Sequence, residues 1–157
     1  MPSQIRTGDI VFIVDLSGSM TEGAKLRIVL NSVKTALQTF ALGLRPDFGF
    51  GLRVVYVAER LEEFPIGEDF EIPAPSASGG TFDDDALADY LSAHRDGQDL
   101  FFLFSDVPHD TSAADRVFTI LVGDEVPPEK YTGNTISAET FPSLWQIAAE
   151  GGQGGAS

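Results

Sequence analysis

The sequence contains no cysteine, and that absence removes several kinds of site at once. Disulfides, thiolate nucleophiles and zinc sites built on cysteine are all excluded. A chain without cysteine also fits a reducing compartment. Histidine is scarce as well, with two residues in the chain. We therefore interpret His109, which follows Asp106 by three positions, as a surface-loop residue rather than a ligand or a catalyst, and we place His94 at a helix end.

Basic residues are few: 10 lysines and arginines stand against 24 aspartates and glutamates, for a formal net charge of −14. A surface of this sign repels phosphate backbones and anionic lipid, so we expect neither nucleic acid nor a membrane as a partner. It attracts cations and basic protein surfaces. Acidity that serves only solubility explains the same charge, and composition does not separate these alternatives.

Long hydrophobic runs are also missing. The first apolar run, Ile10 to Val14, is too short for the core of a signal peptide or for a membrane span. We therefore expect a soluble, cytoplasmic protein.

The chain has the length of one domain. We assign residues 8–152 to that domain and residues 153–157 to a flexible tail, because the last residues are rich in glycine. A tail of this kind is consistent with a domain taken from a longer protein.

Apolar patterning predicts an alternation of strands and helices. Short apolar runs predict strands at 10–14, 50–58, 61–66, 100–106, 117–123 and 134–138, and helical spacing predicts helices at about 25–42, 83–93 and 141–150. The segment 61–66 follows its predecessor closely enough to be its hairpin partner. We expect an α/β fold, doubly wound and Rossmann-like, with a mostly parallel central sheet, one antiparallel edge strand and helices on both faces.

Polar oxygens gather at the ends of the predicted strands. Asp15 and Asp106 each end an apolar run, so both are expected beyond the carboxyl ends of strands, where ligands of such sheets bind. Ser17 and Ser19 follow Asp15, and Thr81 follows two glycines. Two carboxylates and three hydroxyls are hard oxygen donors, which suit Mg²⁺, Ca²⁺ or Mn²⁺.

These residues resemble the metal-ion-dependent adhesion site of von Willebrand factor A domains. Asp15, Ser17 and Ser19 match its D-x-S-x-S motif, Thr81 its loop threonine and Asp106 its downstream aspartate, and the order of elements agrees over roughly residues 8–152. One departure is Val107-Pro108, where the family usually has glycine after the second aspartate.

The resemblance implies a function. The five residues would surround one divalent cation, most simply Mg²⁺ and alternatively Ca²⁺ or Mn²⁺, some of them through water. An open coordination position would accept a Glu or Asp carboxylate from a partner protein. The short loops favour an intracellular assembly or signalling scaffold over extracellular adhesion. We thus expect a protein-interaction module and no enzyme.

Two other functions remain open. A Mg²⁺-dependent phosphate hydrolase could use Asp15 as its nucleophile, but Ser17 stands where such enzymes carry a second aspartate as acid or base. A degenerate domain of the same fold would bind no metal.

Purely structural interpretations also exist for the site residues. Ser17 or Ser19 could cap a helix, and Thr81 could cap the 83–93 helix. Asp83, Asp84 and Asp85 are interpreted as a solvated charge run at a helix start, which the helix dipole favours.

Overall fold

The computed structural model describes residues 10–22, 24–43, 52–66, 71–72, 80–94, 99–106, 109, 111–114, 117–122 and 135–137. Within these ranges the chain forms, in order, β1 (Ile10–Asp15), the 3₁₀ helix η1 (Gly18–Thr21), α1 (Lys25–Gly43), β2 (Leu52–Val57), β3 (Leu61–Ile66), α2 (Asp84–Ala93), β4 (Leu100–Ser105), β5 (Val117–Leu121) and β6 (Thr135–Ser137). The predicted elements inside the described ranges are confirmed, with ends that differ by a few residues.

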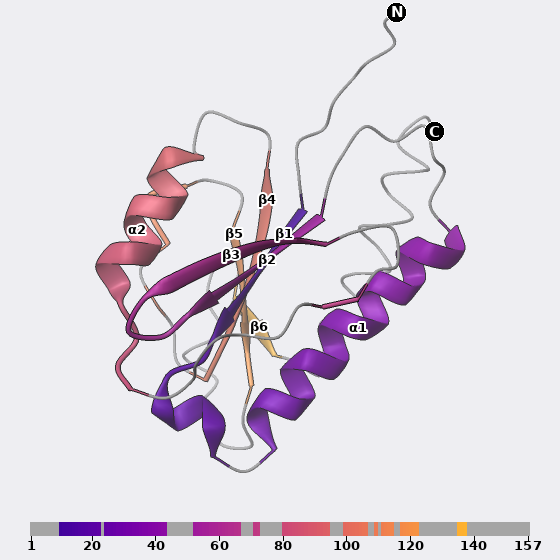
Figure 1. Ribbon diagram of the computed structural model, residues 1–157, viewed down its shortest axis with the longest axis horizontal. Helices are drawn as coiled ribbons and strands as arrows, with labels where there is room; N and C mark the ends of the chain where they lie inside the picture. The colour runs from indigo at the N-terminus through magenta and orange to yellow at the C-terminus, as the bar shows by residue number, and fades with distance from the viewer. Residues whose placement is uncertain are drawn as a thin grey trace, which may run out of the picture.

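The strands form one sheet in the order β3-β2-β1-β4-β5-β6 (Figure 1). All neighbouring pairs are parallel except β2 and β3, which are antiparallel. The edge strand β3 is therefore the hairpin partner that the sequence predicted. The strand order reverses direction on either side of β1, which is the arrangement of a doubly wound sheet.

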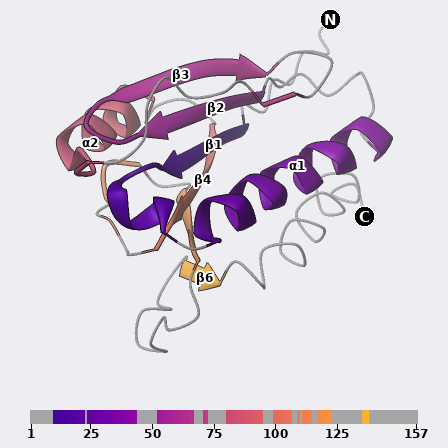
Figure 2. The same cartoon turned by 60° about the horizontal axis from the view of Figure 1, so that its bottom comes forward.

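The helices cover opposite faces of this sheet (Figures 1 and 2). Successive side chains of a strand point to opposite faces, so the continuous apolar run of β1 serves two cores. Phe12 and Val14 pack with Val29 and Val33 of α1. Val11, on the other face, packs with a second buried group that includes Leu87 and Leu91 of α2, Val55, Phe101 and Leu103. Burial on both sides explains why β1 carries no polar residue before Asp15.

None of the helices in the described part of the chain has the length and apolar character that a bilayer crossing demands. The predicted closing helix at 141–150, the tail at 153–157 and the domain limits at residues 8 and 152 lie outside the described residues. So do Val107 and Pro108, the departure from the family motif.

The candidate site residues lie at the carboxyl end of the parallel sheet. β1 pairs in parallel with β4, so their carboxyl ends lie side by side. Figure 2 shows that β1 runs directly into η1 and the start of α1 at this edge. The strand order reverses here, which is where ligands of doubly wound sheets bind.

Candidate functional site at the carboxyl ends of β1 and β4

Asp15 and Asp106 leave neighbouring strands at the same edge, as the sequence predicted. Asp15 is the last residue of β1, and Asp106 directly follows Ser105, the last residue of β4. The hydroxyl of Ser105 donates a hydrogen bond of 2.5 Å to Oδ2 of Asp15 and so joins the two strand ends. Ser105 is fully buried. The sequence analysis missed it, although it is the polar residue that ends an otherwise apolar run.

The Asp15 carboxylate is buried and hydrogen-bonded at both oxygens. Its side chain is 1% exposed. Oδ1 accepts a 2.8 Å hydrogen bond from the backbone N–H of Ser17, while Oδ2 faces Ser105 and His109. Burial alone would raise the pKa of Asp15, but the hydrogen bonds from His109, Ser105 and Ser17 outweigh it and lower the pKa. Asp15 is therefore an anion fixed in one orientation.

His109 lies inside the site, and its interpretation as a surface-loop residue is wrong. Its side chain is 8% exposed, and its ring stacks on Phe82 with 3.8 Å between ring centroids. Nε2 lies 3.2 Å from Oδ2 of Asp15 and 3.0 Å from the Ser105 hydroxyl, and Nδ1 lies 3.1 Å from Oδ1 of Asp84. The sequence signal that could have placed His109 in the site was its position three residues after Asp106.

The two carboxylates also favour the charged form of His109. Burial alone would lower its pKa, but the hydrogen bonds and negative charges of Asp15 and Asp84 outweigh that effect and raise it. An imidazolium can donate from both nitrogens, one to each carboxylate. The single N–H of Nε2 is shared between Asp15 and the Ser105 hydroxyl, which itself donates to Asp15.

The serines of the D-x-S-x-S motif are not helix caps. Ser17 occupies the N-cap position of η1, but its side chain makes no capping hydrogen bond there. Ser19 lies inside η1, and its side chain is exposed. Ser17 therefore does not cap η1, and its side chain instead hydrogen-bonds to Asp15, while the Ser19 side chain faces solvent.

Two glycines connect the motif to the Thr81 segment. The backbone N–H of Gly18 donates a 2.9 Å hydrogen bond to the carbonyl of Gly80. Gly80 has φ +81°, in the left-handed region that favours glycine, and a Cβ on it would lie 2.5 Å from a Glu59 carboxylate oxygen. This link places Thr81, whose side chain is exposed, beside the D-x-S-x-S turn.

Thr81 does not cap α2. Asp83 is the N-cap, and its carboxylate accepts a 3.0 Å hydrogen bond from the N–H of Ala86. Asp84 and Asp85 follow in the first turn of the helix, where the positive end of the helix dipole stabilises their negative charges. The charge run is thus structural at Asp83, while Asp84 also contacts His109.

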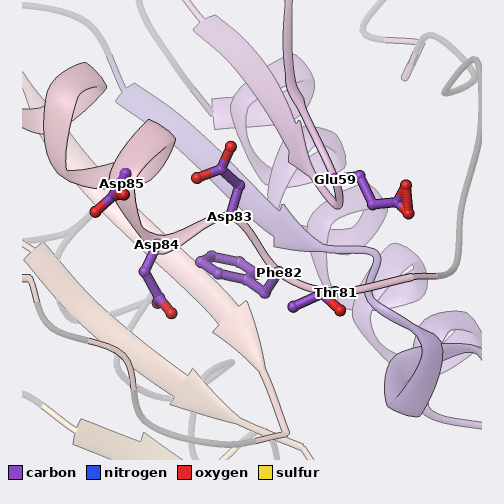
Figure 3. A pocket seen from close by; sticks show the side chains of 6 residues that line it. All are labelled: Glu59, Thr81, Phe82, Asp83, Asp84 and Asp85. Carbon is purple, nitrogen blue, oxygen red and sulfur yellow. The ribbon is translucent and has the colours of Figure 1, made fainter.

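An acidic pocket opens on this side of the site. It has a volume of about 510 Å³ and is lined by Glu59, Thr81, Phe82, Asp83, Asp84 and Asp85. Thr81, Phe82 and Asp83 belong to the segment that leads into α2, and Asp84 and Asp85 to its first turn (Figure 3). Glu59 comes from the turn between β2 and β3. Phe82 is the apolar residue of this lining, and it is also buried in the core on the α2 side of the sheet.

Asp106 carries a cationic partner that the sequence analysis did not consider. Nζ of Lys25 lies 3.0 Å from Oδ2 of Asp106 and 3.3 Å from the carbonyl oxygen of Ser19. The Asp106 side chain is 8% exposed. Its other oxygen, Oδ1, is buried and has no hydrogen-bond partner within the described residues.

The five predicted ligands are thus linked as two pairs and one neighbouring residue. Asp15 contacts Ser17 directly, Asp106 and Ser19 meet through Lys25, and Thr81 is held to the D-x-S-x-S turn by its neighbour Gly80. Within the described ranges, no group of three or more histidines, aspartates or glutamates is placed to hold a metal. A cation here would therefore depend on hydroxyl and water oxygens beside the two carboxylates, a set that suits Mg²⁺.

Nucleophilic chemistry fits the site poorly. Ser105, His109 and Asp84 lie in the order of a serine–histidine–aspartate relay, but the Ser105 hydroxyl is fully buried and donates to Asp15. Asp15 itself is buried and hydrogen-bonded at both oxygens. Neither group can approach a substrate without breaking these contacts.

Comparison with solved structures identifies the fold. No protein-family model matches the sequence, and no curated protein matches it. The ArnB paralog VWA2 from Sulfolobus acidocaldarius aligns with a TM-score of 0.60 at 17% identity over 93% of this chain. The mussel byssus proximal thread matrix protein 1 aligns with a TM-score of 0.62 at 14% identity over 90% of this chain, in a structure with a zinc-occupied metal-ion-dependent adhesion site. A von Willebrand factor type A protein from Catenulispora acidiphila aligns with a TM-score of 0.56 at 12% identity over 92% of this chain.

The chain therefore has a von Willebrand factor A-like fold, as the motif suggested. The alignments cover 45%, 46% and 42% of these three proteins, so the chain spans less than half the length of each. At such low identities the likeness concerns the fold alone.

Proposed function

We propose that this domain is a protein-interaction module that binds an acidic residue of its partner through a divalent cation. Asp15, Ser17, Ser19, Thr81 and Asp106 would hold the cation, directly or through water. Bound there, the cation supplies a Lewis-acid position that attracts a carboxylate. The domain itself performs no catalysis.

The observation that carries this proposal is the Asp106 carboxylate. Its Oδ1 is buried without a hydrogen-bond partner within the described residues, although an unmatched buried carboxylate oxygen is costly. It lies at the same end of the sheet as Asp15, Ser17 and Ser19, and the Ser17 hydroxyl does not cap η1. A hard cation with its water would satisfy Oδ1 of Asp106 and would draw on the nearby oxygens of Asp15, Ser17 and Ser19.

Relatives in fold support the same idea. The mussel byssus protein shows that this fold can hold a divalent metal at its adhesion site. The oxygen-only donor set of this chain favours Mg²⁺ or Mn²⁺ over zinc, which prefers nitrogen and sulfur ligands.

The net charge of the chain bears on how a partner carboxylate can bind. The chain is strongly acidic, so an approaching carboxylate is repelled unless a cation neutralises the site locally. We therefore expect partner binding to depend strictly on the metal. An intracellular assembly or signalling scaffold remains the setting that the short loops favour.

Metal binding is tested by titration calorimetry and thermal unfolding with Mg²⁺, Mn²⁺ and Ca²⁺ after treatment with a chelator. We expect each bound cation to raise the midpoint of thermal unfolding, because a ligand that binds only the folded state stabilises it. Asp106→Asn and Ser19→Ala should weaken binding at least about tenfold. Ser19→Ala is the cleaner variant, because its side chain is exposed.

Ser92→Ala is the matched control. It removes an exposed hydroxyl from α2, away from the D-x-S-x-S turn, and should bind metal as the wild type does. The proposal is wrong if no cation binds, or if Ser19→Ala and Ser92→Ala bind equally well. Affinity capture with and without chelator then identifies the partner, and turnover of a phosphomonoester that Asp15→Asn abolishes would instead establish the hydrolase.

A further inference from the structure

Lys25 occupies a position that local helix preferences disfavour. It is the first residue of α1, where the helix dipole is positive, and the first turn of α1 has no acidic residue to offset it. The reason for a lysine here is tertiary, since its ammonium reaches Asp106, 81 positions further along the chain. The contact also includes the carbonyl oxygen of Ser19. Lys25 thus joins η1 to the end of β4 at the candidate cation site.

The two oxygens of Asp106 have different environments because of Lys25. Oδ2 accepts from the ammonium at 3.0 Å, while Oδ1 is buried without a hydrogen-bond partner in the described part of the chain. A carboxylate held in this way offers one oxygen to another ligand and keeps the second engaged. The side chain of Asp106 is 8% exposed, so solvent screens this ion pair only partly.

We propose that Lys25 sets the cation selectivity of the site by restricting Asp106 to one-oxygen coordination. This inference rests on the proposed function, because it assumes that Asp106 faces a divalent cation. Mg²⁺ takes six ligands in octahedral geometry and accepts carboxylates through single oxygens. Ca²⁺ takes six to eight ligands and often uses both oxygens of a carboxylate. The Lys25 ammonium therefore disfavours Ca²⁺ more than Mg²⁺.

The ammonium has a second effect on both cations. A fixed positive charge beside Asp106 repels any divalent ion and neutralises the carboxylate in the ion's absence. Removing it should tighten binding of both Mg²⁺ and Ca²⁺, with the larger gain for Ca²⁺. Repulsion alone acts equally on two ions of the same charge, so the ratio of the two affinities isolates the coordination effect.

The test compares Lys25→Met with the wild type and with Lys34→Met. Both substitutions remove one positive charge from α1 and keep an apolar stem, but Lys34 is exposed and two to three turns further along the helix. Titration calorimetry with MgCl₂ and CaCl₂ gives both dissociation constants for each protein. Circular dichroism verifies folding, and Lys25→Gln replaces Lys25→Met if the latter does not fold.

We expect the ratio of the Ca²⁺ to the Mg²⁺ dissociation constant to fall about tenfold in Lys25→Met and to stay unchanged in Lys34→Met. In chelator, Lys25→Met should also unfold at a lower temperature than Lys34→Met, because Asp106 loses its partner. An unchanged ratio in Lys25→Met, with metal still bound, overturns the role of Lys25 and leaves the proposed function intact. Absence of metal binding in the wild type overturns both.

Discussion

Nε2 of His109 lies 3.2 Å from Oδ2 of Asp15, across 94 positions of the chain. The contact joins the end of β1 to the loop that follows β4, and the other ring nitrogen extends it to Asp84 at the start of α2. Stacking on Phe82 fixes the plane of the ring. One side chain thereby connects three segments of the candidate site.

His109→Ala should lower the free energy of unfolding by about 2–3 kcal/mol, because it removes a stacked ring and a donor to a buried carboxylate. His109→Phe separates the two causes, since it keeps an aromatic ring on Phe82 and loses only the polar contacts. Urea unfolding in chelator gives the free energies. If both variants are as stable as the wild type, the contact with Asp15 contributes nothing to the fold.

The pH dependence of stability follows from the raised pKa of His109. A group whose pKa is higher in the folded than in the unfolded state stabilises the protein fully below the unfolded value, near 6.5 for histidine. That stabilisation is lost as the pH rises through the folded value. We therefore expect the difference in stability between wild type and His109→Phe, measured in chelator, to shrink as the pH rises above about 6.5.

Asp15, whose pKa is lowered, sets the low-pH limit of the same contact. Its contribution is present above the unfolded pKa and is lost as the pH falls through the folded value. The contact should thus be strongest between the ordinary pKa values of the two groups. A stability difference that does not shrink on either side of this range would contradict an ionic contact.

Gly80→Ala should destabilise the protein by about 1–2 kcal/mol, because alanine pays the cost of a left-handed backbone at φ +81°. Its Cβ would also displace the Glu59 side chain. Gly18→Ala is the control, since a Cβ there would meet its nearest atom at an ordinary 3.7 Å. Chemical unfolding measures the free energy of unfolding of both variants. Equal losses of stability would mean that the left-handed backbone at position 80 carries no extra cost for alanine.

Asp83→Ala should cost about 1 kcal/mol of stability, because it removes the side-chain cap of α2. Asp83→Asn should be nearly neutral, since asparagine caps helices as well as aspartate does. Asp85→Ala is the control within the first turn, where only the weaker dipole interaction is lost. Equal effects of Asp83→Ala and Asp85→Ala would refute the assignment of the cap.

Much of the fold could be predicted from local patterns. The apolar run before Asp15 and the similar run before Asp106 indicated strands buried on both faces, and both are strands of the parallel sheet. Their aspartates were expected at one edge because parallel strands end at the same side of a sheet. The antiparallel edge strand at 61–66 followed from its short separation from β2.

The contacts within the site could not be predicted in this way. His109 was interpreted as a surface residue because the chain has two histidines and no cysteine, yet its partners Asp15 and Asp84 come from other segments. Lys25 was part of an amphipathic pattern and gave no sign of Asp106. Thr81 fitted a capping role as well as a ligand role until Asp83 proved to be the cap.

The sequence by itself determined the alternation of strands and helices and the side of the sheet on which the oxygen donors gather. Periodic apolar burial is a local property, and it constrains each element without reference to the rest of the chain. Only the tertiary structure decided which polar groups meet: His109 with Asp15, and Lys25 with Asp106. Those pairings depend on short distances between segments that are 81 and 94 residues apart, and such distances exist only once the strands have been ordered in the sheet.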